Sequence, residues 1–263
     1  MMGLVGLGLL YVGRMRLMII LMLSGLAVLL TLSWTRWILE PIGYFFLVGA
    51  AAIALVLSLF FPAYVAWKEK SAPVKFYNRW YFYLGWFLAT TLFAEILLPT
   101  LREHVLGYDS FRTPARSMLQ TLAPGDLFTV DTWRYEKQSP TAGDVVVFRT
   151  PEGYTFVKRI VGTPGDRIEI HSGVVHRNGR AILEPYTYRE PSDTPYGRDA
   201  PSITLGISQY YVLGDYRDQS KDSRNYGPID ESQLIGRVES IVFSFWDGSI
   251  HPSRFPLRLT DDT

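Results

Sequence analysis

The stretch FVKRIVGTPGD, residues 156–166, places two adjacent cations inside an apolar run. Alternation along a strand puts Lys158 on the same face as Phe156 and Ile160. Burial between apolar side chains lowers the pKa of a lysine from its usual value of roughly 10.4. The stretch therefore predicts a β-strand that carries a candidate base. An edge-strand lysine that discourages aggregation is the alternative.

Short β-rich runs separated by turn signals fill the chain after about residue 126. Strands this short and closely spaced are typical of a mostly antiparallel β domain. Asn178-Gly179 predicts a tight hairpin between 174–177 and 181–183. A segment rich in Pro, Asp, Tyr and Gly at 184–208 is expected to form a surface excursion. The predicted strands are 127–131, 144–149, 156–161, 167–170, 174–177, 210–213 and 236–245.

Long apolar runs dominate the chain before about residue 100. Three of them, at about 17–35, 42–67 and 80–100, reach the roughly 20 residues that a helix needs to span a bilayer. Trp and Tyr residues cluster near their ends, as they do at membrane interfaces. The rest of the chain is too short to bury three such helices in a core. The sequence therefore predicts N-terminal transmembrane α-helices over 1–100, followed by the β-rich domain over 101–263.

The distribution of basic residues orients these predicted spans. Arg14 and Arg16 precede the first run, and several Lys and Arg residues fill the loop 68–79 between the second and third. The turn between the first two runs holds Arg36 and the acidic Glu40. Because basic loops stay in the cytoplasm, three crossings would place 101–263 on the outer face of the membrane.

Composition excludes some functions. The chain has no cysteine, so disulfides and thiolate metal sites are excluded. A formal net charge of +1 gives no support for nucleic-acid binding. Neither a metal nor a cofactor is expected.

A candidate nucleophile, Ser117, lies in the segment ARSMLQTLAPGD, residues 115–126. A serine hydroxyl is a weak nucleophile until a neighbouring base removes its proton. The four histidines, at 104, 171, 176 and 251, lack a recognisable serine-hydrolase context, and there is no G-x-S-x-G motif. By residue type alone Ser117 would be a turn or cap residue. Lys158 is the alternative base, since serine-lysine pairing is a known variant of nucleophilic catalysis.

A third segment, GDYRDQSKDSRNYG at residues 214–227, concentrates charges of both signs around two serines. A solvated loop would explain such a pattern equally well.

These three segments, in this order and behind an apolar N-terminal region, resemble bacterial type I signal peptidase (leader peptidase), a serine-lysine dyad family. The family pattern is Ser-Met leading to Thr-Leu and Gly-Asp, then Lys-Arg, then Gly-Asp-Asn-Arg-Asp followed by Ser-x-Asp-Ser-Arg. The resemblance implies that Ser117 is the nucleophile, that its backbone N–H stabilises the oxyanion, and that Lys158 is the general base. It also implies that Ser220 orients the Lys158 amine. The residues that it implies as further support for the site are Arg159, Asp215, Asp222 and Arg224.

The activity implied is that of a membrane-bound serine endopeptidase, which removes N-terminal signal peptides from secreted preproteins by acyl transfer. Its substrates would carry small residues at positions −1 and −3 of the signal peptide. Its partners would be secretory preproteins and the phospholipid membrane. The implied location is the bacterial inner (cytoplasmic) membrane, with several passes and with the catalytic domain on the periplasmic or outer face.

The chain departs from the family pattern at four positions. Gln120 replaces a usual Pro, and Tyr216 replaces Asn. Ala115 stands where many relatives have a serine that completes the oxyanion hole, and Arg116 stands where a small residue is common. Three alternatives therefore stay open: a specialised peptidase of a secretion or conjugation system, a catalytically silent preprotein-binding membrane protein, and a Ser–His–Asp hydrolase.

Overall fold

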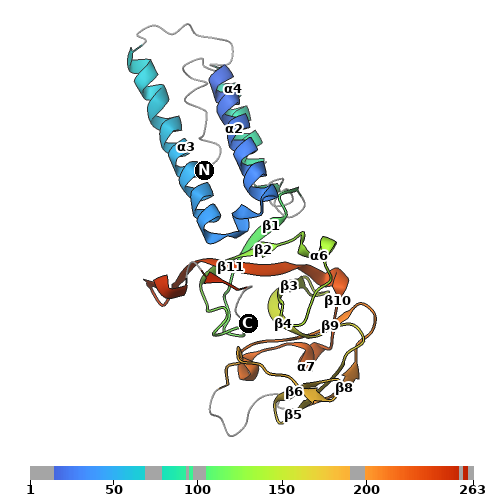
Figure 1. Cartoon of the computed structure of the whole chain (residues 1–263). Coiled ribbons are helices and arrows are strands. Elements are labelled where there is room, and N and C mark those ends of the chain that lie inside the picture. The colour runs from blue at the N-terminus through green and yellow to red at the C-terminus, as the bar shows by residue number, and fades with distance from the viewer. Residues whose placement is uncertain are drawn as a thin grey trace. The chain divides into compact units, whose positions relative to one another are not determined.

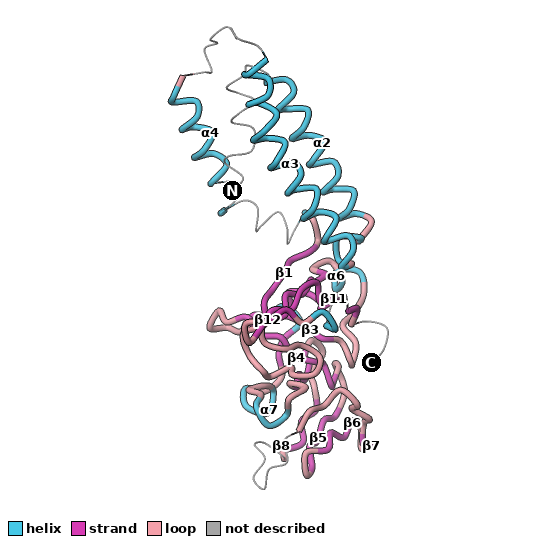
Figure 2. Tube along the Cα trace, turned by 90° about the vertical axis from the view of Figure 1, so that its left-hand side faces the viewer, coloured by secondary structure: helices cyan, strands magenta, loops and turns pink. Residues whose placement is uncertain are grey.

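The computed structural model describes residues 15–68, 79–92, 95–96, 105–189, 199–254 and 257–259. The chain forms two compact units, Met1–Tyr108 and Asp109–Thr263 (Figure 1). The described part of the first unit is mostly helical, and in the second unit strands predominate over helices (Figure 2).

The described part of the first unit contains two long helices joined by a short turn, and a third, shorter helix. The chain reverses direction at the turn, so that α2 leads into it and α3 leads away from it (Figure 1). Pro41 begins α3, and the first position of a helix suits proline because its missing N–H would have no partner there. The helical elements are α2 (Met15–Trp34), η2 (Trp37–Leu39), α3 (Pro41–Lys68) and α4 (Trp80–Leu92).

Helices α2 and α3 coincide with the first two predicted membrane spans, and α4 covers the first part of the third. Residues 93–94 and 97–100 of that third run lie outside the described part of the chain. Among the described residues, no helix combines the length and hydropathy that a membrane span requires. The helices are thus as expected, while their transmembrane character stays a prediction.

The second unit is built on a large sheet with the strand order β1-β2-β11-β3-β4-β9-β10. The pairings from β2 to β10 are antiparallel, which confirms the predicted antiparallel β domain. The 13-residue strand β11 also pairs with two short strands, β12 and β13. The bounds are β1 (Tyr108–Arg112), β2 (Asp126–Asp131), β3 (Val145–Arg149), β4 (Thr155–Gly162), β9 (Gln209–Leu213), β10 (Ile229–Asp230), β11 (Leu234–Trp246), β12 (Ser249–Ile250) and β13 (Leu257–Arg258).

A smaller sheet has the order β7-β6-β5-β8. The predicted hairpin is confirmed: Asn178 and Gly179 have φ of 55° and 78° and connect β6 to β7, as a tight turn with two left-handed residues requires. Strand β8 was not predicted and lies within the segment 184–208, of which 190–198 is outside the described residues. The bounds are β5 (Arg167–His171), β6 (Val174–Arg177), β7 (Arg180–Ala181) and β8 (Ala200–Thr204).

Short helical turns occupy the connections of the second unit. Two of them, η6 and α7, lie in the charged segment 214–227, and η8 follows β12. Their bounds are α6 (Arg134–Lys137), η6 (Arg217–Gln219), α7 (Ser223–Tyr226), η7 (Glu231–Gln233) and η8 (Pro252–Arg254).

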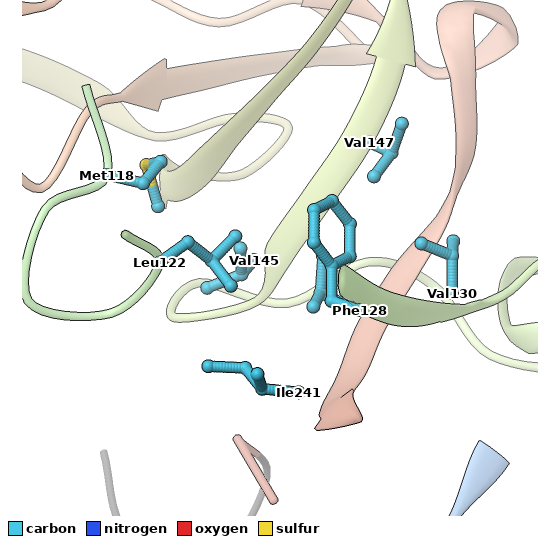
Figure 3. Packing of buried hydrophobic residues seen from close by; sticks show 8 residues of the cluster. Met118, Leu122, Phe128, Val130, Val145, Val147 and Ile241 are labelled. Atoms are coloured by element: carbon cyan, nitrogen blue, oxygen red, sulfur yellow. The ribbon is translucent and has the colours of Figure 1, made fainter. Parts of the chain in front are cut away.

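One hydrophobic cluster of the second unit fixes the segment that carries Ser117. Met118 and Leu122 have no exposed surface and pack with Phe128, Val145 and Ile241 (Figure 3). Burial of a side chain of this size stabilises the fold by about 1.5–3 kcal/mol. The residue after the candidate nucleophile is therefore an anchor, which holds Ser117 at the edge of the core.

Candidate active site

Ser117 and Lys158 meet directly, although 41 residues separate them in the chain. The Lys158 Nζ donates a hydrogen bond of 2.8 Å to Ser117 Oγ. It donates a second, of 2.9 Å, to the carbonyl of Val157. The serine lies in a turn after β1, and the lysine extends from β4.

Strand β4 has the alternation that the sequence predicts. Phe156 and Ile160 pack in one hydrophobic cluster, and Val157 packs in another. Lys158 is opposite Val146, a member of the first cluster. Because β4 pairs with β3 on one side and β9 on the other, it is an interior strand, and the alternative of a protective edge-strand lysine is wrong.

The surroundings of Lys158 favour the neutral amine. The residue is 3% exposed, and its Nζ lies 5.7 Å from the centre of the Phe156 ring. Burial lowers the pKa of Lys158 to about 8, while the carboxylates of Asp222 and Asp215 act in the opposite direction. At pH 7 about one lysine in ten would then be neutral, against roughly one in a few thousand for a free lysine.

Arg159 projects from the other face of β4 and is fully paired. Its Nε and Nη2 donate to the two carboxylate oxygens of Asp215 at 3.0 and 2.8 Å. Its Nη1 donates to the carbonyl of Gly143 at 2.9 Å, and Nη2 also donates to Thr121 Oγ1 at 3.1 Å. The guanidinium carbon lies 3.9 Å from the centre of the Tyr186 ring. This network connects β4 to the Ser117 segment through Thr121, whose hydroxyl donates to Asp215.

Gly214 allows the charged segment to approach Ser117 closely. A Cβ at this position would lie 2.6 Å from the Ser117 carbonyl oxygen and would collide with the Ser220 side chain. The next contact is a hydrogen bond of 3.1 Å from the Tyr216 N–H to that same carbonyl. The segment 214–227 is thus packed against the Ser117 turn and is not a solvated loop.

Asp222 and Arg224 brace this segment. Asp222 is fully buried, begins α7 as its N-cap, and accepts a hydrogen bond of 3.0 Å from the Gly214 N–H. Arg224 donates to both oxygens of Asp222 at 2.8 Å and to the Arg217 carbonyl at 2.7 Å. The buried carboxylate therefore ties both ends of the segment together.

Ser220 does not form the expected hydrogen bond with the Lys158 amine. It is 2% exposed, and its Oγ has no hydrogen-bond partner among the described residues. The Lys158 ammonium directs its described hydrogen bonds to Ser117 and Val157, so the contact implied between Ser220 and the lysine amine is not formed.

Several residues of the network carry no signal in the sequence that would identify them. Glu184 forms a buried ion pair with Arg217, with a separation of 2.8 Å between Oε2 and Nη1. Tyr186 covers Arg159, and Tyr188 bonds to the Asp215 carbonyl through its N–H at 2.8 Å. These three residues come from the start of the segment that was expected to be a surface excursion, where composition alone predicts no contact with the site.

No described histidine takes the place of Lys158. His171 contacts Glu169, and His251 contacts Asp247 and Ser249 at 3.0 and 3.2 Å through the same nitrogen, Nε2. A Ser–His–Asp triad needs different ring nitrogens for the serine and the carboxylate. His104 lies outside the described residues.

Gln120 has a backbone conformation that proline cannot adopt. Its φ is 83°, whereas the proline ring holds φ near −65°. The departure from the family pattern therefore changes the local turn, and restoring proline would oppose the fold seen here. Gly125, by contrast, retains the glycine of the pattern: its φ is 86°, and a Cβ would collide with the Phe245 carbonyl.

The sequence of this chain matches a known protein family. The family described as "Signal peptidase, peptidase S26" matches residues 83–243, and the chain belongs to that family. A probable signal peptidase I-1 of Synechocystis is 32% identical over 145 residues, which cover 52% of this chain and 70% of that protein. A signal peptidase IB of Staphylococcus aureus is 36% identical over 143 residues, covering 49% and 73%. A signal peptidase I from Enterococcus faecalis aligns with a TM-score of 0.35 and 26% identity over 38% of this chain and 97% of that one.

Proposed function

We propose that this chain is a serine endopeptidase that removes N-terminal signal peptides from secreted preproteins, with Ser117 as nucleophile and Lys158 as general base. The observation that carries the proposal is the 2.8 Å hydrogen bond between Lys158 Nζ and Ser117 Oγ. The lowered pKa of the buried lysine makes that amine able to accept a proton near neutral pH. Membership of the signal peptidase family supports the same reaction.

The reaction has two acyl-transfer steps. The neutral Lys158 amine takes the Ser117 hydroxyl proton while Oγ bonds to the scissile carbonyl carbon. The tetrahedral intermediate collapses to an acyl-enzyme, and the new ammonium gives its proton to the leaving amine of the mature protein. A water molecule, deprotonated by the same amine, then hydrolyses the ester and releases the signal peptide.

The oxyanion would accept a hydrogen bond from the Ser117 N–H, which has no acceptor among the described residues. The alanine methyl group at 115 has no proton to donate, so the second donor found in many relatives is missing at that position. Ser220 would rotate its unpartnered hydroxyl toward the amine once Lys158 has lost a proton.

The supporting residues would keep the two reacting groups aligned. Asp215 and Arg159 connect the lysine strand to Thr121, and Asp222 and Arg224 hold the segment that covers the dyad. Alignment of this kind is required because a general base acts only within hydrogen-bond reach of the proton that it removes.

We also propose that the N-terminal unit anchors the enzyme in a bacterial cytoplasmic membrane, with the β unit on the outer face. A helix of the length of α2, 20 residues, extends about 30 Å, which equals the hydrocarbon thickness of a bilayer. The basic residues between α3 and α4 favour a cytoplasmic loop there. Anchoring would confine the enzyme to the membrane where preproteins with small residues at −1 and −3 are presented.

The test is cleavage of a reporter preprotein by the purified, detergent-solubilised chain, run beside Ser117→Ala and Lys158→Ala. Both variants should lose at least about 10³-fold in rate, because each removes a member of the dyad. Lys221→Ala is the matched control, since this exposed lysine lies in the 214–227 segment and should leave the rate unchanged. Normal cleavage by either dyad variant would contradict the mechanism.

A further inference from the structure

Arg254 lies beyond the part of the chain that matches the family, in the short helical turn η8. Strand β12 before this turn pairs with the end of β11, and β13 after it pairs with Ser240 and Ile241 of the same strand. The C-terminal segment, meaning β12, η8 and β13, is therefore attached to β11 at both ends.

The guanidinium of Arg254 contacts the turn that carries Ser117 at three places. Its Nη2 donates to the Thr121 carbonyl at 3.0 Å and to Asp126 Oδ2 at 2.7 Å. Its Nε lies 3.2 and 3.3 Å from the two Asp126 oxygens, and its Nη1 lies 3.5 Å from the Gln120 carbonyl. One side chain thus holds two successive backbone carbonyls and a carboxylate of the same turn.

Asp126 makes this contact rigid. Its carboxylate is fully buried and also accepts hydrogen bonds from the Ala123 N–H at 2.8 Å and the Ser244 hydroxyl at 2.6 Å. Arg254 itself is partly buried, with 21% of its side chain exposed. A forked guanidinium–carboxylate contact of this kind restricts geometry more than a lysine contact can.

The turn needs such support because its backbone is strained. Gln120 is in the left-handed region, which costs a residue other than glycine on the order of 1 kcal/mol. Thr121 is held from two directions: its hydroxyl bonds to Asp215 and its carbonyl bonds to Arg254. A shift of this residue would move Ser117, which lies four residues before it.

We propose that Arg254 is a positioning residue for the reaction, which keeps the Ser117 turn in the conformation that places Oγ against the Lys158 amine. This inference rests on the proposed function. Gln120 has a left-handed backbone that no proline ring could fix, so the turn is held from outside, by Arg254.

The experiment compares wild type with Arg254→Gln, Arg254→Lys and Arg254→Ala in the reporter cleavage assay, with thermal unfolding measured on each protein. Arg254→Gln should lower kcat about 10- to 100-fold with KM changed less than twofold, because small misplacements of a nucleophile have effects of that size. Arg254→Lys should recover less than half of the loss. Guanidinium ion, added far below denaturing concentrations to Arg254→Ala, should restore part of kcat, and ammonium ion should not.

The matched control is Arg167→Gln, which removes another arginine that pairs with a carboxylate, at an exposed position of the smaller sheet. It should leave kcat unchanged. The pH at which the rate rises should be the same in Arg254→Gln as in wild type, since the burial of Lys158 is not altered.

Two results would overturn the inference. Full kcat in Arg254→Gln beside an active wild type would overturn it alone. If Arg254→Gln lost activity only in proportion to the loss of folded protein, with normal kcat for the folded fraction, the role of Arg254 would be purely structural. Failure of folded wild type to cleave, or cleavage by Ser117→Ala, would instead overturn the proposed function on which the inference rests.

Discussion

The two faces of β4 present adjacent buried cations to opposite surroundings. Arg159, 1% exposed, donates to the Asp215 carboxylate and to the Thr121 hydroxyl, and the Tyr186 ring lies over its guanidinium plane. Lys158, 3% exposed, is hydrogen-bonded to a serine hydroxyl and a carbonyl, and no described carboxylate forms an ion pair with it. Burial with a partner stabilises a charge, whereas burial without one favours the neutral amine. The same strand therefore provides a structural cation and a base.

Removal of the carboxylate partner of Arg159 tests whether this cation is structural. Asp215→Asn should destabilise the β unit by about 3–5 kcal/mol, because it leaves a buried guanidinium without a compensating charge. Chemical denaturation with an unchanged m-value would measure this. Glu169→Gln, which breaks the exposed Arg167–Glu169 pair, is the control and should leave the midpoint unchanged. Equal effects of the two substitutions would contradict the assignment of Arg159 and Asp215 as a buried structural pair.

Removal of Lys158 tests whether the cation without a carboxylate partner costs stability. Lys158→Met should abolish cleavage and yet stabilise the fold at pH 7 by up to about 3 kcal/mol, since the pKa of the buried lysine is lowered to about 8 from 10.5. With a folded-state pKa below the unfolded one, the unfolded state binds more protons between pH 8 and 10.5. The free energy of unfolding of the wild type should therefore increase from pH 8 to 10.5 through the titration of Lys158. The Lys158→Met variant should not show this increase. A variant less stable than wild type at pH 7 would indicate that the lysine is a favourable charge.

Some parts of the site could be predicted from the sequence. Lys158 and Arg159 could be assigned to opposite faces because strand alternation is a local property. Ser117, Asp215 and Asp222 could be identified because their segments follow a family pattern. All of the predicted strands formed, since each combined β-rich composition with turn residues at its ends.

The remaining parts depend on contacts between distant segments. Glu184 and Tyr186 come from a segment with no hydrophobic period, and Arg254 comes from beyond the recognised pattern. Strand β8 is mostly exposed and polar, so it lacks the apolar alternation by which a strand is predicted. Ser220 is a different case: the resemblance implied a contact with the lysine amine, but that amine donates its hydrogen bonds to Ser117 and Val157.

The most direct test of the central claim is the pH dependence of kcat/KM for reporter cleavage between pH 6 and 10. If the buried Lys158 amine is the base, the rate should rise with pH through a midpoint of about 8, because only the neutral amine accepts the Ser117 proton. A rate that still rises tenfold per pH unit at pH 10, as a base with the ordinary lysine pKa near 10.4 would give, would contradict the claim that burial makes Lys158 the base. A flat profile across this range would contradict it as well.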